Sequence, residues 1–142
     1  MRKCGVLLPV SSIASKYGIG GFSKEAYDFV DFLAKSGQSL WQILPLGPTG
    51  YGDSPYQSFS TFAGNPYYIS LDALIDEGLL TEAECESVDY GDDDTSIDYE
   101  KIYSTRFELL RKAYDRANIA ENSEYKEFVE ENCSKIVLQI KK

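Results

Sequence analysis

The sequence contains no histidine, and this absence removes several classes of enzyme at once. Without an imidazole, neither a Ser-His-Asp triad nor a Cys-His pair can be built, and the usual zinc sites lose a main ligand. Any acid–base chemistry in this chain would therefore depend on carboxylates, tyrosine, lysine or cysteine.

Cysteines and long apolar segments are also scarce. Cys4, Cys85 and Cys133 are odd in number and widely spaced, which predicts reduced thiols in a cytoplasmic protein and neither a disulfide framework nor a metal knuckle. No apolar run approaches the ~20 residues that a membrane span needs. The apolar stretch near the start is too short and too interrupted for a secretory signal. We expect a cytoplasmic protein without a metal or another cofactor.

Basic residues are outnumbered by acidic ones. The 14 Lys and Arg stand against 23 Asp and Glu, which gives a net charge of -9 and a pI near 4.5. A chain of this charge is repelled by phosphate backbones and anionic lipids, so we expect neither nucleic acid nor membrane as a partner. At 142 residues, of which 43% are hydrophobic, the chain provides at most one domain with a modest core.

The first 45 residues read as a strand, a helix and a second strand. Residues 6–10 and 40–44 are short apolar runs that predict buried parallel strands. Between them, Ser23 occupies an N-cap and Gly37 a left-handed position after the helix end. The apolar face of this helix comprises Ala26, Phe29, Val30 and Leu33. Such a βαβ unit implies parallel pairing and a right-handed crossover.

Between residues 66 and 90 we expect an extended segment and two short helices. Residues 67–71 read as a strand or extended segment. A helical face follows and ends at Gly78, with Leu71, Leu74 and Ile75 as its apolar members. Thr81 and Glu84 form a capping box, which predicts a second helix up to about residue 88.

An acidic stretch, residues 89–98, precedes the longer helices. Its three successive aspartates do not begin an EF-hand, because the sixth and twelfth positions hold Ile97 and Tyr103 in place of glycine and glutamate. We interpret this stretch as a solvated loop. Asp98 then caps a helix whose apolar stripe we interpret as core packing, comprising Tyr103, Phe107, Leu110, Tyr114 and Ala117. A last helix is expected from Ser123, with Phe128 and Val129 facing inward.

Residues 46–68, which we call the aromatic loop, fit neither a helical nor a strand pattern. They contain four glycines and three prolines, which punctuate and stiffen the chain. Among these breakers stand six rings, those of Tyr51, Tyr56, Phe59, Phe62, Tyr67 and Tyr68. A flexible linker would be poor in aromatics. The loop is therefore either a surface built to present rings to a ligand or a core-capping loop whose rings pack inward.

The loop's composition suits a sugar as the ligand. Aromatic faces complement the C–H faces of sugar rings, and the polar groups of Asp53, Ser54, Gln57 and Asn65 can orient hydroxyls in a mostly apolar site. The loop directly follows the second predicted strand, and in α/β sheets the loops at the carboxyl ends of strands carry ligand chemistry. For Asp53 and Asn65 two roles stay open, contact with sugar and support of a turn.

The order of residues in the loop resembles that of the amylomaltases, the 4-α-glucanotransferases of the α-amylase-like glycosidases. Residues 45–57 read Pro-Leu-Gly-Pro-Thr-Gly-Tyr-Gly-Asp-Ser-Pro-Tyr-Gln, and residues 62–66 read Phe-Ala-Gly-Asn-Pro. The match extends over residues 5–9 and 17–20, the pairs Ser11-Ser12 and Trp41-Gln42, and, further on, Leu71 and residues 78–80. The resemblance is dense over the first eighty residues and thins out to about residue 132. A run of this length is far more specific than a short motif.

The resemblance implies an α/β fold that holds the first part of a (β/α)8 TIM-type barrel plus a helical inserted subdomain. We expect residues 1–50 to form the first βαβ unit, and residues 51–132 the substrate-cleft loop and a mainly helical insertion. Residues 133–142 are expected to be a divergent, strand-like tail. A complete barrel takes ~250 residues, so the barrel would be incomplete. Its unpaired edge favours self-association.

The resemblance also implies transfer of α-1,4-glucan segments between malto-oligosaccharides. In that family an Asp forms a covalent glycosyl-enzyme, a Glu protonates the leaving oxygen, and a sugar hydroxyl replaces water as the acceptor. Those carboxylates come from later barrel strands. The resemblance therefore assigns no catalytic residue to this chain, and we expect the isolated chain to be inactive.

Substrate-binding residues do carry over from the family. By the resemblance, Ser54 and Tyr56 line the substrate site near the point of cleavage, and Tyr51 lies near an outer glucan-contact surface. Asp53, Gln57 and Asn65 shape or line the loop. Two alternatives remain, a catalytically inactive malto-oligosaccharide-binding module and a non-functional truncation. The predicted βαβ unit disfavours the first, because binding modules usually present their rings on a closed β-sandwich.

Overall fold

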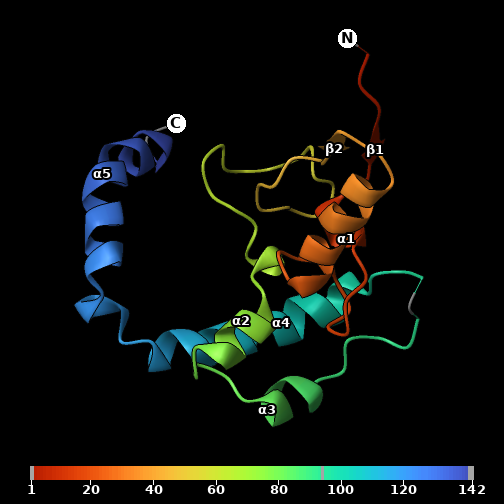
Figure 1. The fold of residues 1–142 in the computed structure, drawn as a ribbon. Coiled ribbons are helices and arrows are strands. Elements are labelled where there is room, and N and C mark those ends of the chain that lie inside the picture. Colours follow the sequence, from red (N-terminus) through yellow and green to blue (C-terminus); the bar gives the residue numbers. More distant parts are fainter. Residues whose placement is uncertain (1, 94, 141–142) are drawn as a thin grey trace.

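The structure is a computed structural model that describes residues 2–93 and 95–140, with side chains as far as residue 132. Two short strands and a helix come first, followed by the aromatic loop and then by a group of helices (Figure 1). The last helix, α5, stands apart from the other elements in this view. None of the helices in the described part has the length and apolar character needed to cross a membrane.

The two strands pair in parallel on either side of a helix in the sequence. β1 (Gly5–Leu7) and β2 (Leu40–Gln42) run in register, with Gly5 opposite Leu40 and Leu7 opposite Gln42. A side chain added at Gly5 would lie only 2.3 Å from the carbonyl oxygen of Leu40, so this close pairing requires glycine. The strand–helix–strand order and the parallel pairing confirm the sequence prediction.

Both strands are shorter and more exposed than the sequence predicts. The predicted first strand, residues 6–10, ends early because Pro9 has no N–H and the chain turns into the 3₁₀ helix η1 (Val10–Ser12). Leu7 and Leu40 are 56% and 52% exposed. The prediction of buried strands is therefore wrong here, since the sheet has only two strands among the described residues and each leaves apolar side chains uncovered.

The helix between the strands, α1 (Lys24–Lys35), ends as predicted. Gly37 has φ of 73°, the left-handed conformation expected after a helix end. Ser23 is the N-cap, but its hydroxyl donates to the Glu25 carboxylate and does not accept a backbone N–H. Of the predicted inner face, Ala26 and Leu33 are buried, and the Phe29 ring packs edge-on against Trp41 at 5.2 Å. Val30, the other predicted member of that face, is 46% exposed.

The segment after the aromatic loop is helical where the sequence predicts extended chain. Residues 66–68 form the 3₁₀ helix η2 (Pro66–Tyr68). The Asn65 side-chain oxygen accepts the Tyr67 N–H at 3.0 Å and caps this turn, with proline at its first position. Capping and the rigid proline outweigh the strand preference of the two tyrosines, so the strand prediction is wrong for this part.

The caps and helix ends predicted between residues 71 and 116 hold. α2 (Leu71–Asp76) ends before Gly78, whose φ is 73°, and α3 (Glu82–Glu86) begins with the full capping box of Thr81 and Glu84. The carboxylate of Asp98 accepts the Lys101 N–H at 3.1 Å and starts α4 (Tyr99–Arg116). Residues 87–98 contain no helix or strand among those described, in agreement with the predicted loop.

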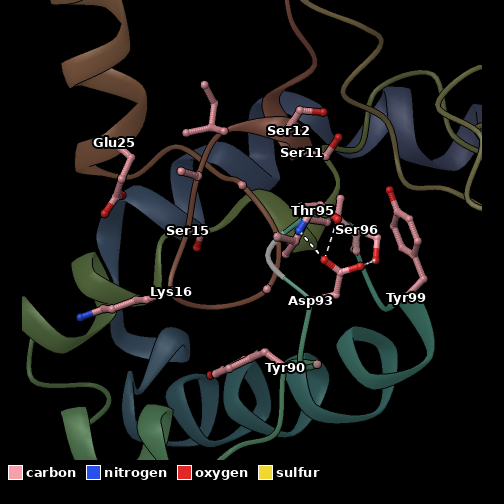
Figure 2. Close-up of a pocket in the computed structure, with 17 residues that line it drawn as sticks. Ser11, Ser12, Ser15, Lys16, Glu25, Tyr90, Asp93, Thr95, Ser96 and Tyr99 are labelled. Atoms are coloured by element: carbon pink, nitrogen blue, oxygen red, sulfur yellow. Dashed lines mark hydrogen bonds between the residues drawn. The ribbon is translucent and has the colours of Figure 1, made fainter.

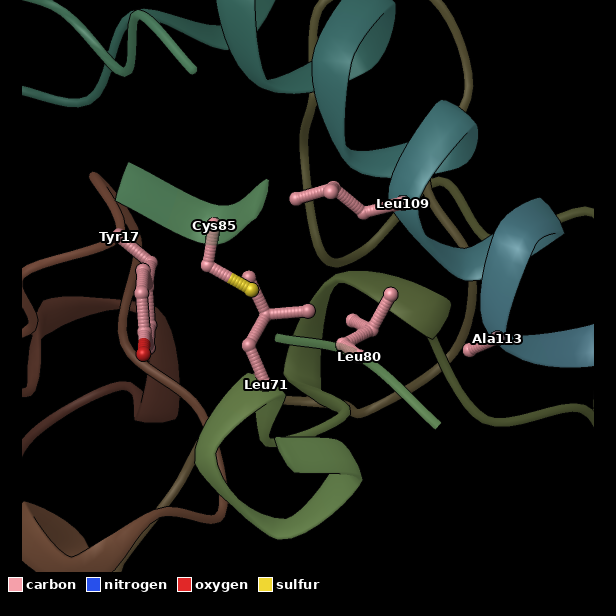
Figure 3. Close-up of a cluster of buried hydrophobic side chains, with 6 residues drawn as sticks. All are labelled: Tyr17, Leu71, Leu80, Cys85, Leu109 and Ala113. Carbon is pink, nitrogen blue, oxygen red and sulfur yellow. The ribbon is translucent and has the colours of Figure 1, made fainter. Parts of the chain in front are cut away.

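The helices enclose a hydrophobic core together with Tyr17 from the amino-terminal part (Figure 3). Its buried members come from α2, α3, α4 and the chain between them, and are Tyr17, Leu71, Leu80, Cys85, Leu109 and Ala113. A second cluster joins η1, η2 and α4 through Val10, Ile19, Tyr67, Tyr68 and Ile102. The two clusters tie the segments on both sides of the aromatic loop to α4.

The buried face of α4 differs from the predicted stripe. Tyr103, Phe107 and Tyr114 are exposed, whereas the buried side chains are those of Ile102, Arg106, Leu109 and Ala113. These positions precede the predicted ones by a single residue, which corresponds to a rotation of about 100° around the helix. The stripe with the tyrosines and the phenylalanine is the more apolar one by composition. The stripe that is actually buried contains an arginine, and for that reason the sequence did not predict it as the inner face.

That arginine is buried almost completely. Arg106 is 2% exposed, and its Nη2 donates to the carbonyl oxygens of Tyr67, at 3.0 Å, and of Ile69. Its Nε and Nη1 have no hydrogen-bond partner among the described residues. Burial lowers the pKa of this guanidinium. The side chain thus fixes the end of the aromatic loop to α4 at a considerable desolvation cost.

The final helix, α5 (Ser123–Ile140), follows the short turn η3 (Ile119–Glu121). The side-chain oxygen of Asn122 accepts the Tyr125 N–H at 2.9 Å, so the cap lies one residue before the predicted Ser123. Phe128, predicted to face inward, is 58% exposed. Residues 133–140 continue the helix, and the prediction of a strand-like tail is wrong, since propagating an existing helix overrides the weak β preference of a few branched residues.

Candidate functional site

The aromatic loop is held by hydrogen bonds at its base and in its middle. The Asn65 N–H donates to the Leu46 carbonyl at 2.8 Å and closes the two ends of the loop. Thr49 and Ser58 form an isolated antiparallel bridge. A side chain at Gly47 would meet the Ser58 hydroxyl at 2.3 Å, so glycine is needed for this close approach. These contacts give the loop a defined shape without a helix or strand.

The tip of the loop is a tight turn around Asp53. The Asp53 N–H donates to the Gly50 carbonyl at 3.1 Å, and the Thr49 hydroxyl donates to the Asp53 carboxylate at 3.3 Å. Asp53 has φ of 51°, a left-handed conformation that aspartate tolerates better than most residues. The next turn is closed by the Gln57 N–H on the Ser54 carbonyl at 3.0 Å. Asp53 therefore supports a turn at the tip of the loop.

The six rings of the loop separate into two groups. Tyr51 is fully exposed, and the rings of Tyr56, Phe59 and Phe62 are 72%, 77% and 66% exposed. Tyr67 and Tyr68 are buried at the base, where Tyr67 packs against Tyr99 and Phe107. Each of the two interpretations of the loop thus holds for part of it, because its tip presents rings to solvent and its base caps the core.

The sequence-predicted binding residues lie on both sides of this division. Tyr51, Tyr56 and Gln57 are exposed at the tip, and Ser54 is half-buried beside them. Asp53 and Asn65 line a cavity of about 90 Å³ together with Pro55, Tyr67 and Tyr99. The side-chain oxygen of Asn65 is already engaged in the turn, and the residue is 6% exposed.

A larger cavity, of about 710 Å³, lies beside the small one (Figure 2). One wall is the connection after β1, residues 11–20, and the other is the loop before α4. Ser11, Ile19 and Tyr99 line both cavities. No binding role was predicted for these residues from the sequence. The position of Ser11 and Ser12 directly after the first strand is the signal that could have pointed to them.

Three acidic side chains of the described part, those of Glu84, Asp89 and Asp93, are held in structural contacts. Hydrogen bonds from Arg116 and Thr81 lower the pKa of Glu84 to about 2. Lys101 lowers the pKa of Asp89, and Thr95 with Ser96 lowers that of Asp93. A general acid needs a raised pKa, and none of these three groups has one. Among the described residues no cluster of three cysteine or acidic side chains could hold a metal ion.

Comparison with known proteins assigns the chain to a family. Residues 8–138 match the family model of 4-alpha-glucanotransferase, glycoside hydrolase family 77. The chain belongs to the 4-alpha-glucanotransferase family. This confirms the resemblance to amylomaltases, and the match extends six residues beyond residue 132, where the resemblance was predicted to end.

Individual relatives agree with the assignment. The 4-alpha-glucanotransferase of Streptococcus pneumoniae is 51% identical over 134 residues, which are 94% of this chain and 26% of the relative. That of Clostridium butyricum is 50% identical over 122 residues, 86% of this chain and 25% of the relative. The chain thus spans about a quarter of the length of these 4-alpha-glucanotransferases.

A solved structure of the same family superposes closely. The amylomaltase from Streptococcus agalactiae in complex with acarbose matches with a TM-score of 0.84 at 38% identity. The match covers 95% of this chain and 27% of the amylomaltase. The described fold is therefore that of one part of an amylomaltase, consistent with the predicted α/β class.

Proposed function

We propose that this chain supplies the glucan-binding loop of a 4-alpha-glucanotransferase. The enzyme would move α-1,4-glucan segments between malto-oligosaccharides by a retaining double displacement, in which a sugar hydroxyl takes the place of water. We propose a cytoplasmic location, in line with the reduced state expected of the cysteines. Membership in the family supports this activity.

The tip of the aromatic loop is the observation that carries the proposal. Four large apolar rings stand exposed on a segment of fixed shape, where burying them against a ligand is favourable. Because the loop is already closed by its own hydrogen bonds, little ordering is needed on binding. A relative solved with acarbose supports a saccharide as the ligand.

The proposed roles of the polar residues follow from their positions. Tyr51 and Tyr56 offer ring faces to glucose units, and the Ser54 hydroxyl and the Gln57 amide bond to sugar hydroxyls. Asp53 and Asn65 shape the loop from its inner side, since both line the small cavity and the Asn65 side chain caps η2. None of these residues is assigned a chemical step.

We assign the catalytic carboxylates to other barrel strands of a complete enzyme. In this assignment β1 and β2 are the first strands of a (β/α)8 barrel, and residues 51–132 form the cleft loop with a helical insertion. The exposed side chains of Leu7 and Leu40 fit strands that further strands and helices would cover. The same uncovered edge favours self-association of the isolated chain, which light scattering after size-exclusion chromatography measures.

The proposal is tested in two steps on the 142-residue chain. Incubation with maltotriose should leave the sugar unchanged, because this chain contributes no catalytic carboxylate; release of glucose and longer oligosaccharides would contradict that assignment. A titration with maltoheptaose should then show binding. Tyr56→Ala should weaken it at least tenfold, about 1.4 kcal/mol, whereas Tyr114→Ala, which removes an exposed tyrosine of α4, should not. Equal weakening by both variants would refute a specific glucan site on the loop.

A further inference from the structure

The larger cavity is separate from the exposed tip of the aromatic loop. It lies between the connection after β1, with Ser11, Ser12 and Ser15, and the loop before α4, with Asp93, Thr95 and Ser96 (Figure 2). Tyr90 forms its base and Tyr99 stands at one side. Its volume, about 710 Å³, falls in the range of ~300–1,000 Å³ that small-molecule sites occupy.

The wall formed by the first connection is fixed in place. A side chain at Gly20 would lie 2.2 Å from the Val10 carbonyl oxygen, and one at Gly18 would lie 2.8 Å from Tyr90. The Tyr17 hydroxyl donates to Asp72 at 2.7 Å, and the Tyr90 hydroxyl donates to the Cys85 carbonyl at 2.8 Å. Since these anchors belong to the core, the cavity is shaped before any ligand arrives.

The charged groups around the cavity are all engaged. Asp93 accepts hydrogen bonds from the Thr95 N–H, the Thr95 hydroxyl and the Ser96 hydroxyl at 2.6 to 2.9 Å. Lys16 pairs with Asp72 at 3.2 Å, and Glu25 accepts the Ser23 hydroxyl. An anion would find no uncommitted cation here and would face the Asp93 carboxylate. The electrostatics therefore favour a neutral ligand.

Hydroxyl groups supply the remaining polar contacts. The Ser12 hydroxyl has no hydrogen-bond partner within the described chain and can donate and accept. The hydroxyls of Thr95 and Ser96 donate to Asp93, so their oxygens still have lone pairs for a ligand. The rings of Tyr90 and Tyr99 add apolar surface. Sugar hydroxyls both donate and accept, and sugar C–H faces suit such rings.

We propose that this cavity binds a neutral mono- or disaccharide, at a site distinct from the aromatic loop. Its walls are the serines after β1 and the hydroxyls of Thr95 and Ser96, and Tyr99 lines both this cavity and the smaller one next to the loop. The proposal rests on the geometry of the cavity and does not require the loop to bind glucan.

A titration of the ¹⁵N-labelled chain with maltose, followed by amide chemical shifts, tests the proposal. The amides of Gly18, Gly20, Gly91 and Ser96 should move and saturate together. Ser12→Ala should weaken this response at least tenfold, and it cannot unfold the wall because the hydroxyl has no protein partner. Thr95→Val should weaken it as well. The matched control Ser104→Ala/Thr105→Val removes two hydroxyls that bond only to carbonyls of α4 and should change nothing.

The remaining outcomes separate this site from the proposed glucan loop. If maltose shifts only amides of the aromatic loop, such as Gly50 and Gly52, and Tyr56→Ala abolishes these shifts, the cavity proposal is overturned while the loop proposal stands. If the cavity amides respond and Tyr56→Ala leaves them unchanged, the cavity is an independent site. A response of the cavity amides to sulfate in place of maltose, or to neither, also overturns the proposal.

Discussion

The aromatic loop and the group formed by α2, α3 and α4 are built in opposite ways. The loop keeps its shape through backbone hydrogen bonds and tight turns, and it leaves most of its large rings in solvent. The helices bury a continuous core, and α3 and α4 begin with side-chain caps. Arg106 joins the two regions through the carbonyls of Tyr67 and Ile69. The comparison teaches that the buried packing resides mainly in the helices, and it fits the proposal that the loop contacts the ligand.

Removal of the buried arginine should have the largest effect on stability. Arg106→Ala leaves a cavity in the core and takes the donor from the buried Tyr67 carbonyl and the partly buried Ile69 carbonyl, so the free energy of unfolding should fall by roughly 3–5 kcal/mol. Urea denaturation followed by circular dichroism measures it. Arg111→Ala, on the exposed side of the same helix, removes surface contacts to Asp115 and to the Tyr114 ring and should stay within about 0.5 kcal/mol. Similar urea midpoints for Arg106→Ala and Arg111→Ala would contradict the conclusion that Arg106 stabilises the contact between the loop and the helices.

The second largest effect on stability should be the difference between substitutions on the two faces of α4. Leu109→Ala truncates a side chain that is 1% exposed and should destabilise by about 2–5 kcal/mol. Tyr103→Ala removes a larger ring from the solvent side, and should cost under about 1 kcal/mol. The same urea series distinguishes them. A greater loss of unfolding free energy from Tyr103→Ala than from Leu109→Ala would support the inner face predicted from the sequence and contradict the described packing.

The capping box should give the smallest effect, visible as a pH dependence. Arg116 and Thr81 hold the pKa of Glu84 near 2 in the folded chain, below its ordinary value. Its contribution is present above the unfolded pKa and is lost as pH falls from about 4.5 towards 2. The melting temperature of the wild type should therefore approach that of Glu84→Gln over this window.

A control separates this contact from a general charge effect. Glu82→Gln changes the charge of the same helix without removing the bond to Arg116, so its difference from the wild type should lack this pH dependence. Parallel melting curves for wild type and Glu84→Gln from pH 6 to pH 2 would show that the ion pair contributes nothing to folding.

Local signals in the sequence predicted several helix starts and ends correctly. Gly37 and Gly78 mark helix ends, Thr81 with Glu84 starts α3, and Asp98 starts α4, because each of these depends on a few neighbouring residues. The parallel pairing of the two strands followed from the βαβ order. The exposed tip of the aromatic loop was one of two interpretations that composition alone left open.

Features set by distant contacts were missed. No prediction was made for Arg106, and its burial is explained by two carbonyls that lie 37 to 39 positions away in the sequence. Because Arg106 is charged, the stripe that contains it was not predicted to be the buried face of α4. The larger cavity joins residues 11–20 to the loop before α4, which no sequence period connects. Such pairings need tertiary packing, which overrides local preference.

The division between the two regions is tested most directly by Tyr51→Ala/Tyr56→Ala, with unfolding and maltoheptaose binding measured on the same preparation. Both rings are exposed, so the free energy of unfolding should stay within about 0.5 kcal/mol of the wild type. Binding should be lost. Unchanged binding, or binding lost only together with the folded structure, would contradict the assignment of ligand contact to the loop.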